Sequence, residues 1–228
     1  MIGFIEGEGS FVVAERGDLS FVITQSVLNI GVLYIIKWTL GFGSVIKQGA
    51  NTFRFVVQDE AGLKLIILLC YRNLCITKRI SQLIKFIHAY NVRYGAKLSI
   101  KSFTAIRPTW NDAWLVGYID GEGCFNISWI STQSRFKISF SVSQSYSLDL
   151  LEYLIVLFGV GRIEGDNQFV FHCYDHFDHG RSHLIPYLER FPLKTTKLNS
   201  YCLWLTLIGM IERGYKIGNA RFNSIIKL

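Results

Sequence analysis

Met1–Phe11 reads MIGFIEGEGSF, and Leu115–Phe125 reads LVGYIDGEGCF. From the third residue on, the two stretches are identical at six of nine positions and conservatively changed at the other three. Glu122 follows Glu8 by 114 residues, which is half of the 228-residue chain. A pattern that recurs at half the chain length predicts two similar halves, each led by the same element.

The composition favours a globular protein with a polyanionic partner. Half of the residues are hydrophobic, the net charge is +7, and the basic excess lies mostly in the first half. Such an excess raises affinity for phosphate backbones without giving sequence preference. The mean hydropathy is +0.28, but the longest charge-free run, Leu19–Ile36, is interrupted by polar residues, which argues against a membrane span. Five cysteines without a CxxC pair favour a reducing compartment.

Behind each motif, the hydrophobic periodicity predicts the same order of elements, α-β-β-α-β-β-α-α, in an α+β fold. We expect two pseudo-symmetric repeats, at residues 1–99 and 113–228, with a linker at 100–112. Gly41 and Gly159 are expected to end the second helix of each repeat, and Pro186 to lie in the first turn of its helix, where the missing N–H is tolerated. In the first repeat, the expected elements after the motif are Ser10–Ala14, Ser20–Gln25, Leu28–Leu40, Gly43–Lys47, Phe53–Gln58, Ala61–Tyr71 and Thr77–Tyr94. In the second repeat they are Cys124–Ile130, Phe136–Gln144, Leu148–Phe158, Gly161–Glu164, Gln168–Tyr174, Ser182–Arg190 and Thr196–Met210.

One face of each expected antiparallel sheet is polar. In Phe136–Gln144, apolar residues alternate with Lys and Ser, as in a strand with one buried face. Hydroxyl, amide and cationic side chains on such a face can contact DNA in the major groove; an ordinary solvated face fits the same pattern. The predicted DNA-facing residues are Ser20, Thr24, Ser44, Arg54, Gln58, Asn126, Ser128, Lys137, Ser139, Ser141, Ser143, Arg162 and Glu164.

The motifs themselves read as short helices that pack on each other. Two glycines four residues apart lie on one helix face, and they allow close approach of a second helix. The pairs are Gly3 with Gly7 and Gly117 with Gly121. Gly9 and Gly123 are expected to end these helices in the left-handed conformation.

This packing would place Glu8 beside Glu122. Two carboxylates at neighbouring helix C-termini repel each other unless a cation lies between them. With the main-chain carbonyls of Gly7 and Gly121, they form an all-oxygen ligand set that suits Mg²⁺. Glu6 and Asp120 point away and are expected to cap or support the fold. The alternative is that Glu8 and Glu122 are surface acids at the ends of two ordinary helices.

The motifs GFIEGEG and GYIDGEG resemble the sequence that names the LAGLIDADG homing endonucleases, and the resemblance covers essentially the whole chain. It implies a monomer with internal pseudo-twofold symmetry, in which two saddle-shaped sheets hold a long double-stranded DNA site. It also implies Mg²⁺ as cofactor, which Ca²⁺ or Mn²⁺ can replace, and an origin in a mitochondrial or chloroplast genome. The chain begins at the first motif position, inside the helix that leads the first repeat.

The resemblance assigns site residues by position. The metal-binding acids map to Glu8 and Glu122. The glutamines near the metal map to Gln25 and Gln144. The basic active-site residues map to Lys78 and Lys197. The two lysines could instead bind phosphate or be solvated.

The resemblance implies a site-specific endonuclease that makes a staggered double-strand cut. Some members instead, or in addition, act as RNA maturases that assist splicing of their intron, and intron RNA is then the partner. A DNA-binding regulator without cleavage is a third possibility. Retention of both acids favours the nuclease.

Overall fold

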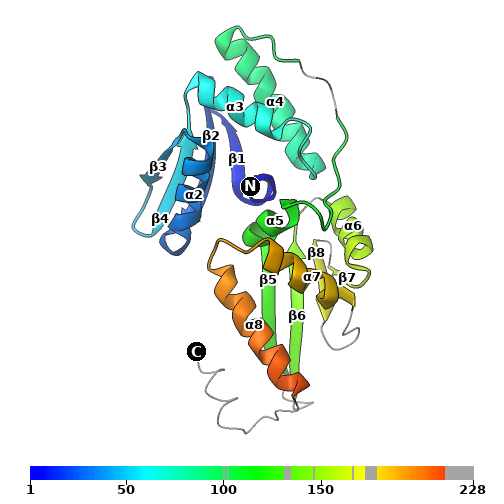
Figure 1. The fold of residues 1–228 in the computed structure, drawn as a ribbon. Coiled ribbons are helices and arrows are strands. Elements are labelled where there is room, and N and C mark those ends of the chain that lie inside the picture. Colours follow the sequence, from blue (N-terminus) through cyan, green and yellow to red (C-terminus); the bar gives the residue numbers. More distant parts are fainter. Residues whose placement is uncertain are drawn as a thin grey trace.

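The computed structural model describes residues 1–99, 101, 103–130, 135–145, 147–165, 167–172 and 179–213. The first half contains α1 (Ile2–Glu8), β1 (Gly9–Val13), β2 (Leu19–Ser26), the 3-10 turn η1 (Val27–Asn29), α2 (Ile30–Leu40), β3 (Ser44–Lys47), β4 (Thr52–Val57), α3 (Glu60–Cys70) and α4 (Thr77–Tyr94). The second contains α5 (Trp114–Glu122), β5 (Gly123–Ile130), β6 (Arg135–Ser143), α6 (Leu148–Phe158), β7 (Arg162–Glu164), β8 (Gln168–His172), α7 (His179–Arg190) and α8 (Lys197–Glu212). This order confirms the predicted α-β-β-α-β-β-α-α repeat (Figure 1).

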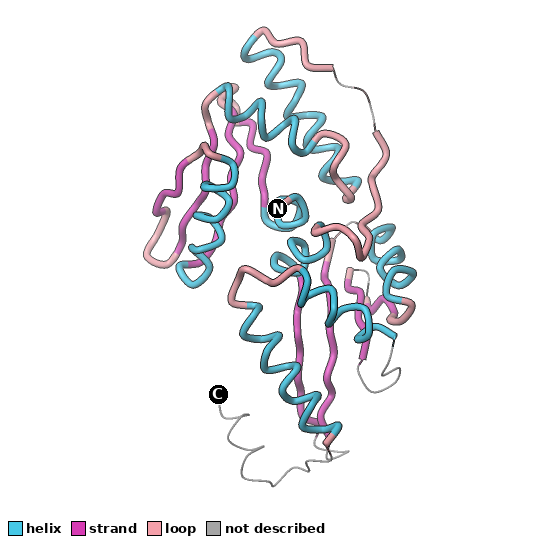
Figure 2. Tube along the Cα trace, in the orientation of Figure 1, coloured by secondary structure: helices cyan, strands magenta, loops and turns pink. Residues whose placement is uncertain are grey.

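Each half forms one four-stranded antiparallel sheet. The strand orders, β1-β2-β4-β3 and β5-β6-β8-β7, are the same when the halves are aligned. Apolar side chains on alternate residues, such as Phe21 and Ile23 in β2, face the helices and form a separate core in each half. The other face of each sheet carries no helix among the described elements (Figure 2). The end of the last predicted strand, residues 173–174, lies outside the described residues.

Local sequence signals explain several helix ends. Gly41 and Gly159 follow α2 and α6 with φ of 77° and 66°, as predicted for left-handed caps. Asp59 precedes α3 and accepts a hydrogen bond from the Gly62 amide at 2.7 Å, which satisfies one of the free N–H groups of the first turn. Of the described helices, none is long and apolar enough to span a membrane.

The prediction for Pro186 was wrong. α7 begins at His179, not at Ser182, so Pro186 lies in the helix interior. Proline removes a donor to the carbonyl four residues earlier, which belongs to Ser182. Both residues are exposed, so water can reach that carbonyl, and the helix continues through the proline.

The two motif helices, α1 and α5, pack against each other between the halves (Figure 1). A Cβ placed on Gly3 would lie 1.9 Å from the Trp114 carbonyl oxygen, and one on Gly117 would lie 2.9 Å from the Phe4 nitrogen. Backbone therefore touches backbone, which confirms the predicted reason for these glycines.

Gly9 and Gly123 do not end the motif helices in the left-handed conformation, as the sequence had suggested. Their φ values are −77° and −74°, in extended backbone that leads directly into β1 and β5. Glycine is needed here because there is no room for a side chain. An added Cβ would lie 2.5 Å from the Ile5 carbonyl oxygen at Gly9 and 2.8 Å from the Ile119 carbonyl oxygen at Gly123.

Candidate active site at the paired helix ends

Glu8 and Glu122 end α1 and α5 and lie beside each other. A Cβ on Gly7 would be 3.4 Å from the Glu122 Cγ, and one on Gly121 would be 3.4 Å from the Glu8 Cγ. Each glutamate thus lies along the glycine of the opposite helix. The close helix packing described above is what brings the two acids together.

Burial raises the pKa of both carboxyl groups. For Glu122 the charge of Glu8 raises the pKa further, whereas Lys197 and Arg79 lower it. For Glu8 a hydrogen bond from Gln25 lowers it, as do the same two cations. The paired carboxylates are therefore electrostatically unfavourable, and an additional cation between them would relieve that cost.

The donor atoms fit a hard divalent cation. Two carboxylates and two main-chain carbonyls, of Gly7 and Gly121, provide oxygen ligands only, which suits Mg²⁺, Ca²⁺ or Mn²⁺. No group of three or more His, Cys, Asp or Glu side chains suited to a metal occurs in the described part of the chain. An ion at this pair would thus complete its coordination with water and substrate oxygens, as Mg²⁺ commonly does.

Two basic side chains hold the carbonyls at these helix ends. Lys197 donates from Nζ to the Gly121 carbonyl oxygen at 2.5 Å and to that of Ile119 at 3.3 Å. In the first half Arg79 takes the corresponding position: it donates from Nη2 to the Gly7 carbonyl oxygen at 2.9 Å and from Nε to that of Glu6 at 2.7 Å. Lys78, the residue that aligns with Lys197, is exposed.

Arg79 was missed by sequence reasoning. The sequence feature that could have indicated Arg79 is the pair of basic residues Lys78-Arg79. When the two copies are aligned, this pair matches Lys197-Leu198, which has only one basic residue. Burial lowers the pKa of Arg79 and of Lys197, and the acids of the pair oppose that shift.

The two predicted glutamines have different environments. Gln25, at the end of β2, is buried, hydrogen-bonds to Glu8, and accepts from Asn29 Nδ2 at 3.3 Å. Gln144 follows the last residue of β6 and accepts from the Tyr118 hydroxyl at 2.6 Å. Position 4 of the first motif has Phe in place of Tyr118, so this second contact has no counterpart in the first half.

Glu6 and Asp120 are structural, as predicted. Glu6 accepts hydrogen bonds from the amides of Cys75 at 2.9 Å and Ile76 at 2.8 Å, immediately before α4. Asp120 accepts from the amides of Lys194 at 2.8 Å and Thr195 at 3.1 Å, immediately before α8. These carboxylates hold the starts of α4 and α8, and with them Arg79 and Lys197, against the motif helices.

The strand registers place the predicted DNA-facing residues on one face of each sheet. Pairs such as Thr24 with Arg54 and Ser128 with Lys137 lie opposite each other across neighbouring strands. All thirteen lie within strands except Gln58, which follows the last residue of β4. Ser139 and Ser141 are buried, so their hydroxyls are less accessible than the others.

Two similar halves in one chain, each with a four-stranded sheet, meet through paired helices that end in facing glutamates. These features define a pseudo-twofold α+β protein with one composite acidic site. A family model described as "LAGLIDADG endonuclease" matches residues 1–104 and again residues 115–208. The chain belongs to the LAGLIDADG endonuclease family.

Curated relatives are intron-encoded proteins. A probable intron-encoded endonuclease 4 of Neurospora crassa is 30% identical over 92% of this chain and 39% of its own length. The probable intron-encoded endonuclease Cox1-I1b of Schizosaccharomyces pombe is 26% identical over 66% and 46%. The intron-encoded RNA maturase bI4 of Saccharomyces cerevisiae is 24% identical over 70% and 24%. The chain therefore spans less than half the length of these relatives.

Solved structures share the whole fold. The meganuclease I-SmaMI bound to uncleavable DNA superimposes with a TM-score of 0.81 at 21% identity, covering 99% of this chain and 94% of the other. I-SmaMI bound to uncleaved DNA with calcium ions gives 0.76 at 19% identity, covering 99% and 95%. The LAGLIDADG homing endonuclease I-GzeII with its DNA target gives 0.76 at 20% identity, covering 99% and 94%. At these identities the likeness establishes the fold.

Proposed function

We propose that this chain is a site-specific homing endonuclease, which makes a staggered double-strand cut in a long DNA target by metal-dependent phosphodiester hydrolysis. The observation that carries the proposal is the pairing of Glu8 and Glu122 across the glycine-rich interface. Intron-encoded endonucleases among the relatives and DNA complexes among the similar structures support it. Their intron origin also supports a mitochondrial or chloroplast gene.

Mg²⁺ is the proposed cofactor, and Glu8, Glu122 and the carbonyls of Gly7 and Gly121 would hold it. When bound, a divalent ion supplies charge neutralisation at the scissile phosphate and lowers the pKa of nearby water. The raised pKa values of both acids support this assignment, because a shared cation removes the repulsion that contributes to the shift at Glu122.

The proposed roles of the remaining residues follow from their contacts. Lys197 and Arg79 place positive charge beside the two acids, where it can offset charge that develops on a phosphate. Lys78 is exposed in the first turn of α4, next to Arg79 in the sequence, and is proposed to contact the DNA backbone or the active site. Gln25 is proposed to orient Glu8 through its hydrogen bond. In the second half, Gln144 is proposed to take the corresponding role together with Tyr118, from which it accepts a hydrogen bond.

Double-stranded DNA is proposed to lie across the two polar sheet faces. Hydroxyl, amide and basic side chains on these faces can bond to base edges and phosphates. The net charge of +7 adds attraction that does not depend on sequence.

Cleavage selection on a randomised DNA library with Mg²⁺ tests this function and finds the target together. We expect enrichment of one long site, cut on both strands with an overhang. Recovery of no cleaved species with Mg²⁺ or Mn²⁺ would contradict the proposal.

Splicing assistance is the second candidate function, and the maturase bI4 among the relatives favours it. RNA binding by the purified chain and splicing of its intron in vitro test this function. Loss of splicing assistance with retained DNA cleavage, or the reverse, in one set of variants would separate the two activities.

A further inference from the structure

Asn29 joins the two halves of the chain beside the candidate active site. It ends the 3-10 turn η1, directly before α2, and is half-buried. Its Nδ2 donates to Gln25 Oε1 at 3.3 Å, and its Oδ1 accepts from the Thr196 amide at 2.9 Å. Thr196 directly precedes α8. One short side chain thus contacts Gln25 of the first half and the start of α8 in the second half.

The direction of these hydrogen bonds is fixed by the Thr196 amide. A backbone N–H can only donate, so Asn29 turns Oδ1 toward Thr196 and its NH2 group toward Gln25. Gln25 in turn directs Oε1 at Asn29, which leaves its own NH2 group for Glu8, to which it hydrogen-bonds. An ionised carboxylate only accepts hydrogen bonds. The orientation of Gln25 that suits Glu8 is therefore set by a main-chain group of the opposite half.

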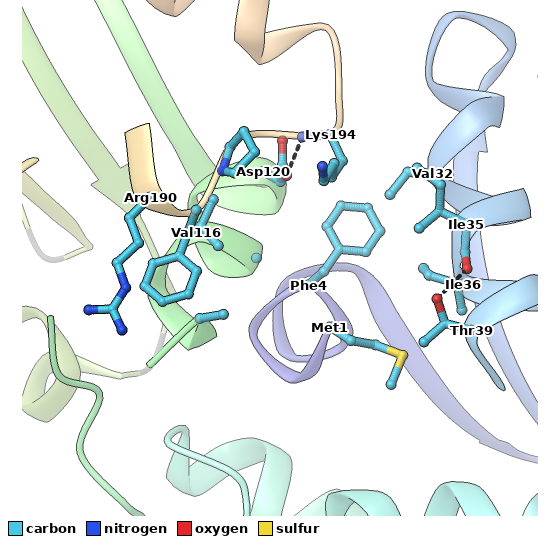
Figure 3. A pocket seen from close by; sticks show the side chains of 14 residues that line it. Met1, Phe4, Val32, Ile35, Ile36, Thr39, Val116, Asp120, Arg190 and Lys194 are labelled. Atoms are coloured by element: carbon cyan, nitrogen blue, oxygen red, sulfur yellow. Dashed lines mark hydrogen bonds between the residues drawn. The ribbon is translucent and has the colours of Figure 1, made fainter. Parts of the chain in front are cut away.

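The same contact lies next to Lys197, the basic residue beside the second acid. Lys197 follows Thr196 and donates to main-chain carbonyl oxygens at the end of α5. Asp120 also holds the segment before α8, by accepting from the Lys194 amide at 2.8 Å (Figure 3). Loss of the Asn29 contact should therefore loosen the start of α8 without detaching it.

The second half has leucine at the position aligned with Asn29. Asn29 lies four residues after Gln25, and the residue four after Gln144 is Leu148, whose side chain is exposed and apolar. Gln144 accepts at Oε1 from the Tyr118 hydroxyl at 2.6 Å and donates from Nε2 to the carbonyl oxygen of the next residue at 3.2 Å. The second glutamine is thus oriented within its own half, whereas the first is oriented from across the interface.

We propose that Asn29 is a positioning residue for the nuclease reaction, which keeps the Gln25 NH2 group directed at Glu8 and links that orientation to the start of α8. This inference rests on the proposed endonuclease function. Asn29 acts through Gln25 and is not itself a catalytic group. If Gln25 were reversed, its Oε1 would face the Glu8 carboxylate, and two acceptors would be in contact without a proton between them.

Two substitutions at this position separate the two hydrogen bonds. Asn29→Asp keeps the acceptor for the Thr196 amide but removes the donor to Gln25, so Gln25 should reverse and direct Oε1 at Glu8. Asp is as favourable as Asn directly before a helix, so this variant should fold. Asn29→Ala removes both contacts. Leu148→Ala, the change at the aligned position of the second half, is the matched control.

Cleavage of the selected DNA target with Mg²⁺ tests the positioning role. Asn29→Asp should lower the single-turnover rate about tenfold or more, as is usual for groups that support a metal-binding side chain, while DNA affinity in Ca²⁺ stays within a few-fold. In a Gln25→Ala background the same substitution should have no further effect, because the residue through which it acts is absent. Leu148→Ala should cut like the unmodified chain. Unchanged cleavage by Asn29→Asp, or an equal loss in both backgrounds, would overturn the proposal.

Nuclear magnetic resonance of the free protein, without metal or DNA, tests the hydrogen bonds apart from the reaction. Thr196 is exposed, so protection of its amide from solvent exchange reports the contact with Asn29. Protection should persist in Asn29→Asp and fall several-fold in Asn29→Ala. The Overhauser contact from the Gln25 NH2 group to the Glu8 side chain should be present in the unmodified chain and lost in Asn29→Asp. Its retention in Asn29→Asp would contradict the proposed orientation.

The two measurements also separate this inference from the proposed function. If the unmodified chain cuts no DNA, the endonuclease proposal fails, and the exchange and Overhauser results in the free protein decide whether Asn29 orients Gln25. If the unmodified chain cuts DNA and Asn29→Asp cuts at the same rate, the inference fails alone.

Discussion

At the residue scale, the two halves of the site share their acids but not their supporting groups. Lys197 holds the Gly121 carbonyl, whereas Arg79 holds the Gly7 carbonyl from the next position along α4. Gln25 contacts Glu8, whereas Gln144 contacts Tyr118. If the chain cuts DNA as proposed, the two strands would therefore meet different side chains in two halves that are otherwise nearly symmetric.

Arg79→Ala should slow cleavage of one strand about 10- to 100-fold, because it removes a cation placed beside the acids. Lys78→Ala should have a smaller effect, since Lys78 is exposed. Duplexes labelled on either strand, cut under single-turnover conditions, measure each strand separately. Arg79→Lys, which keeps the charge, should restore part of the rate, and thermal melting controls for folding. A larger loss in Lys78→Ala than in Arg79→Ala would assign the role to Lys78.

Glu6 should make stability fall as pH rises through the weakly acidic range. Burial raises its pKa from 4.5 to about 7, against hydrogen bonds from Cys75, Ile76 and Trp114. The folded state then binds a proton that the unfolded state has lost, so the free energy of unfolding decreases between pH 4.5 and 7, by at most about 3 kcal/mol. Glu6→Gln should flatten this slope in urea unfolding, whereas Glu152→Gln, at an exposed position, should retain it. Equal slopes of unfolding free energy against pH in the unmodified chain and both variants would contradict the raised pKa of Glu6.

The sequence allowed the acid pair to be predicted, because glycines four residues apart imply helices in close contact. The role of Arg79 could not be predicted in the same way. Which of two neighbouring cations in the first turn of α4 faces α1 depends on the rotation of α4. Glu6 fixes the start of α4 through the amides of Cys75 and Ile76, which lie 69 and 70 residues away in the chain.

At the scale of elements, the fold depends on the α1–α5 contact, where two glycines replace side chains at the crossing. The periodicity of the sequence predicted the order of the elements and the left-handed ends of α2 and α6. It failed at Gly9, Gly123 and Pro186. At Gly9 and Gly123 the backbone is extended, and glycine is needed because nearby atoms leave no room for a Cβ. At Pro186 the carbonyl that loses its helical donor belongs to the exposed Ser182, so water can reach it and the helix can contain the proline.

Gly3→Ala should destabilise the protein by more than about 3 kcal/mol, because the added Cβ would meet the Trp114 carbonyl oxygen at 1.9 Å and no side-chain rotation can relieve a clash with backbone. Gly31→Ala in α2 is the matched control. Its Cβ meets nothing within 4 Å, so helix propensity should stabilise it by about 0.5–1 kcal/mol. Urea unfolding measures both, and similar values for the two variants would contradict the packing.

Lys137→Ala should weaken DNA binding equally for cognate and unrelated sequences and lower the slope of log affinity against log salt by about 0.9, as expected for one lost phosphate contact. Lys64→Ala on α3, which lies on the helical side of the first sheet, should leave the slope unchanged. Fluorescence anisotropy at several salt concentrations provides the measurement. A steeper loss for cognate DNA alone would indicate a base contact at Lys137 instead.

At the scale of the whole molecule, the halves exchange contacts around the pseudo-twofold axis. Asn29 of the first half accepts a hydrogen bond from the Thr196 amide at 2.9 Å, and Thr77 of that half donates to Asp149 of the second at 3.4 Å. Cys75 and Ile76, from the first half, pack in the core of the second. The repeat in the sequence predicts two halves, but it does not predict these contacts between them. The residues that make them belong to no motif or periodic pattern.

The most direct test of the central claim is cleavage by the single variants Glu8→Gln and Glu122→Gln on the selected target, with Mg²⁺. Both substitutions keep the shape of the side chain and remove one charge of the proposed metal-binding pair, so each should lower cleavage at least about 100-fold while DNA affinity in Ca²⁺ stays within a few-fold. Glu152→Gln, the same change at an exposed helix position, should cut like the unmodified chain. Cleavage by Glu8→Gln and Glu122→Gln at the rate of the unmodified protein would contradict the account.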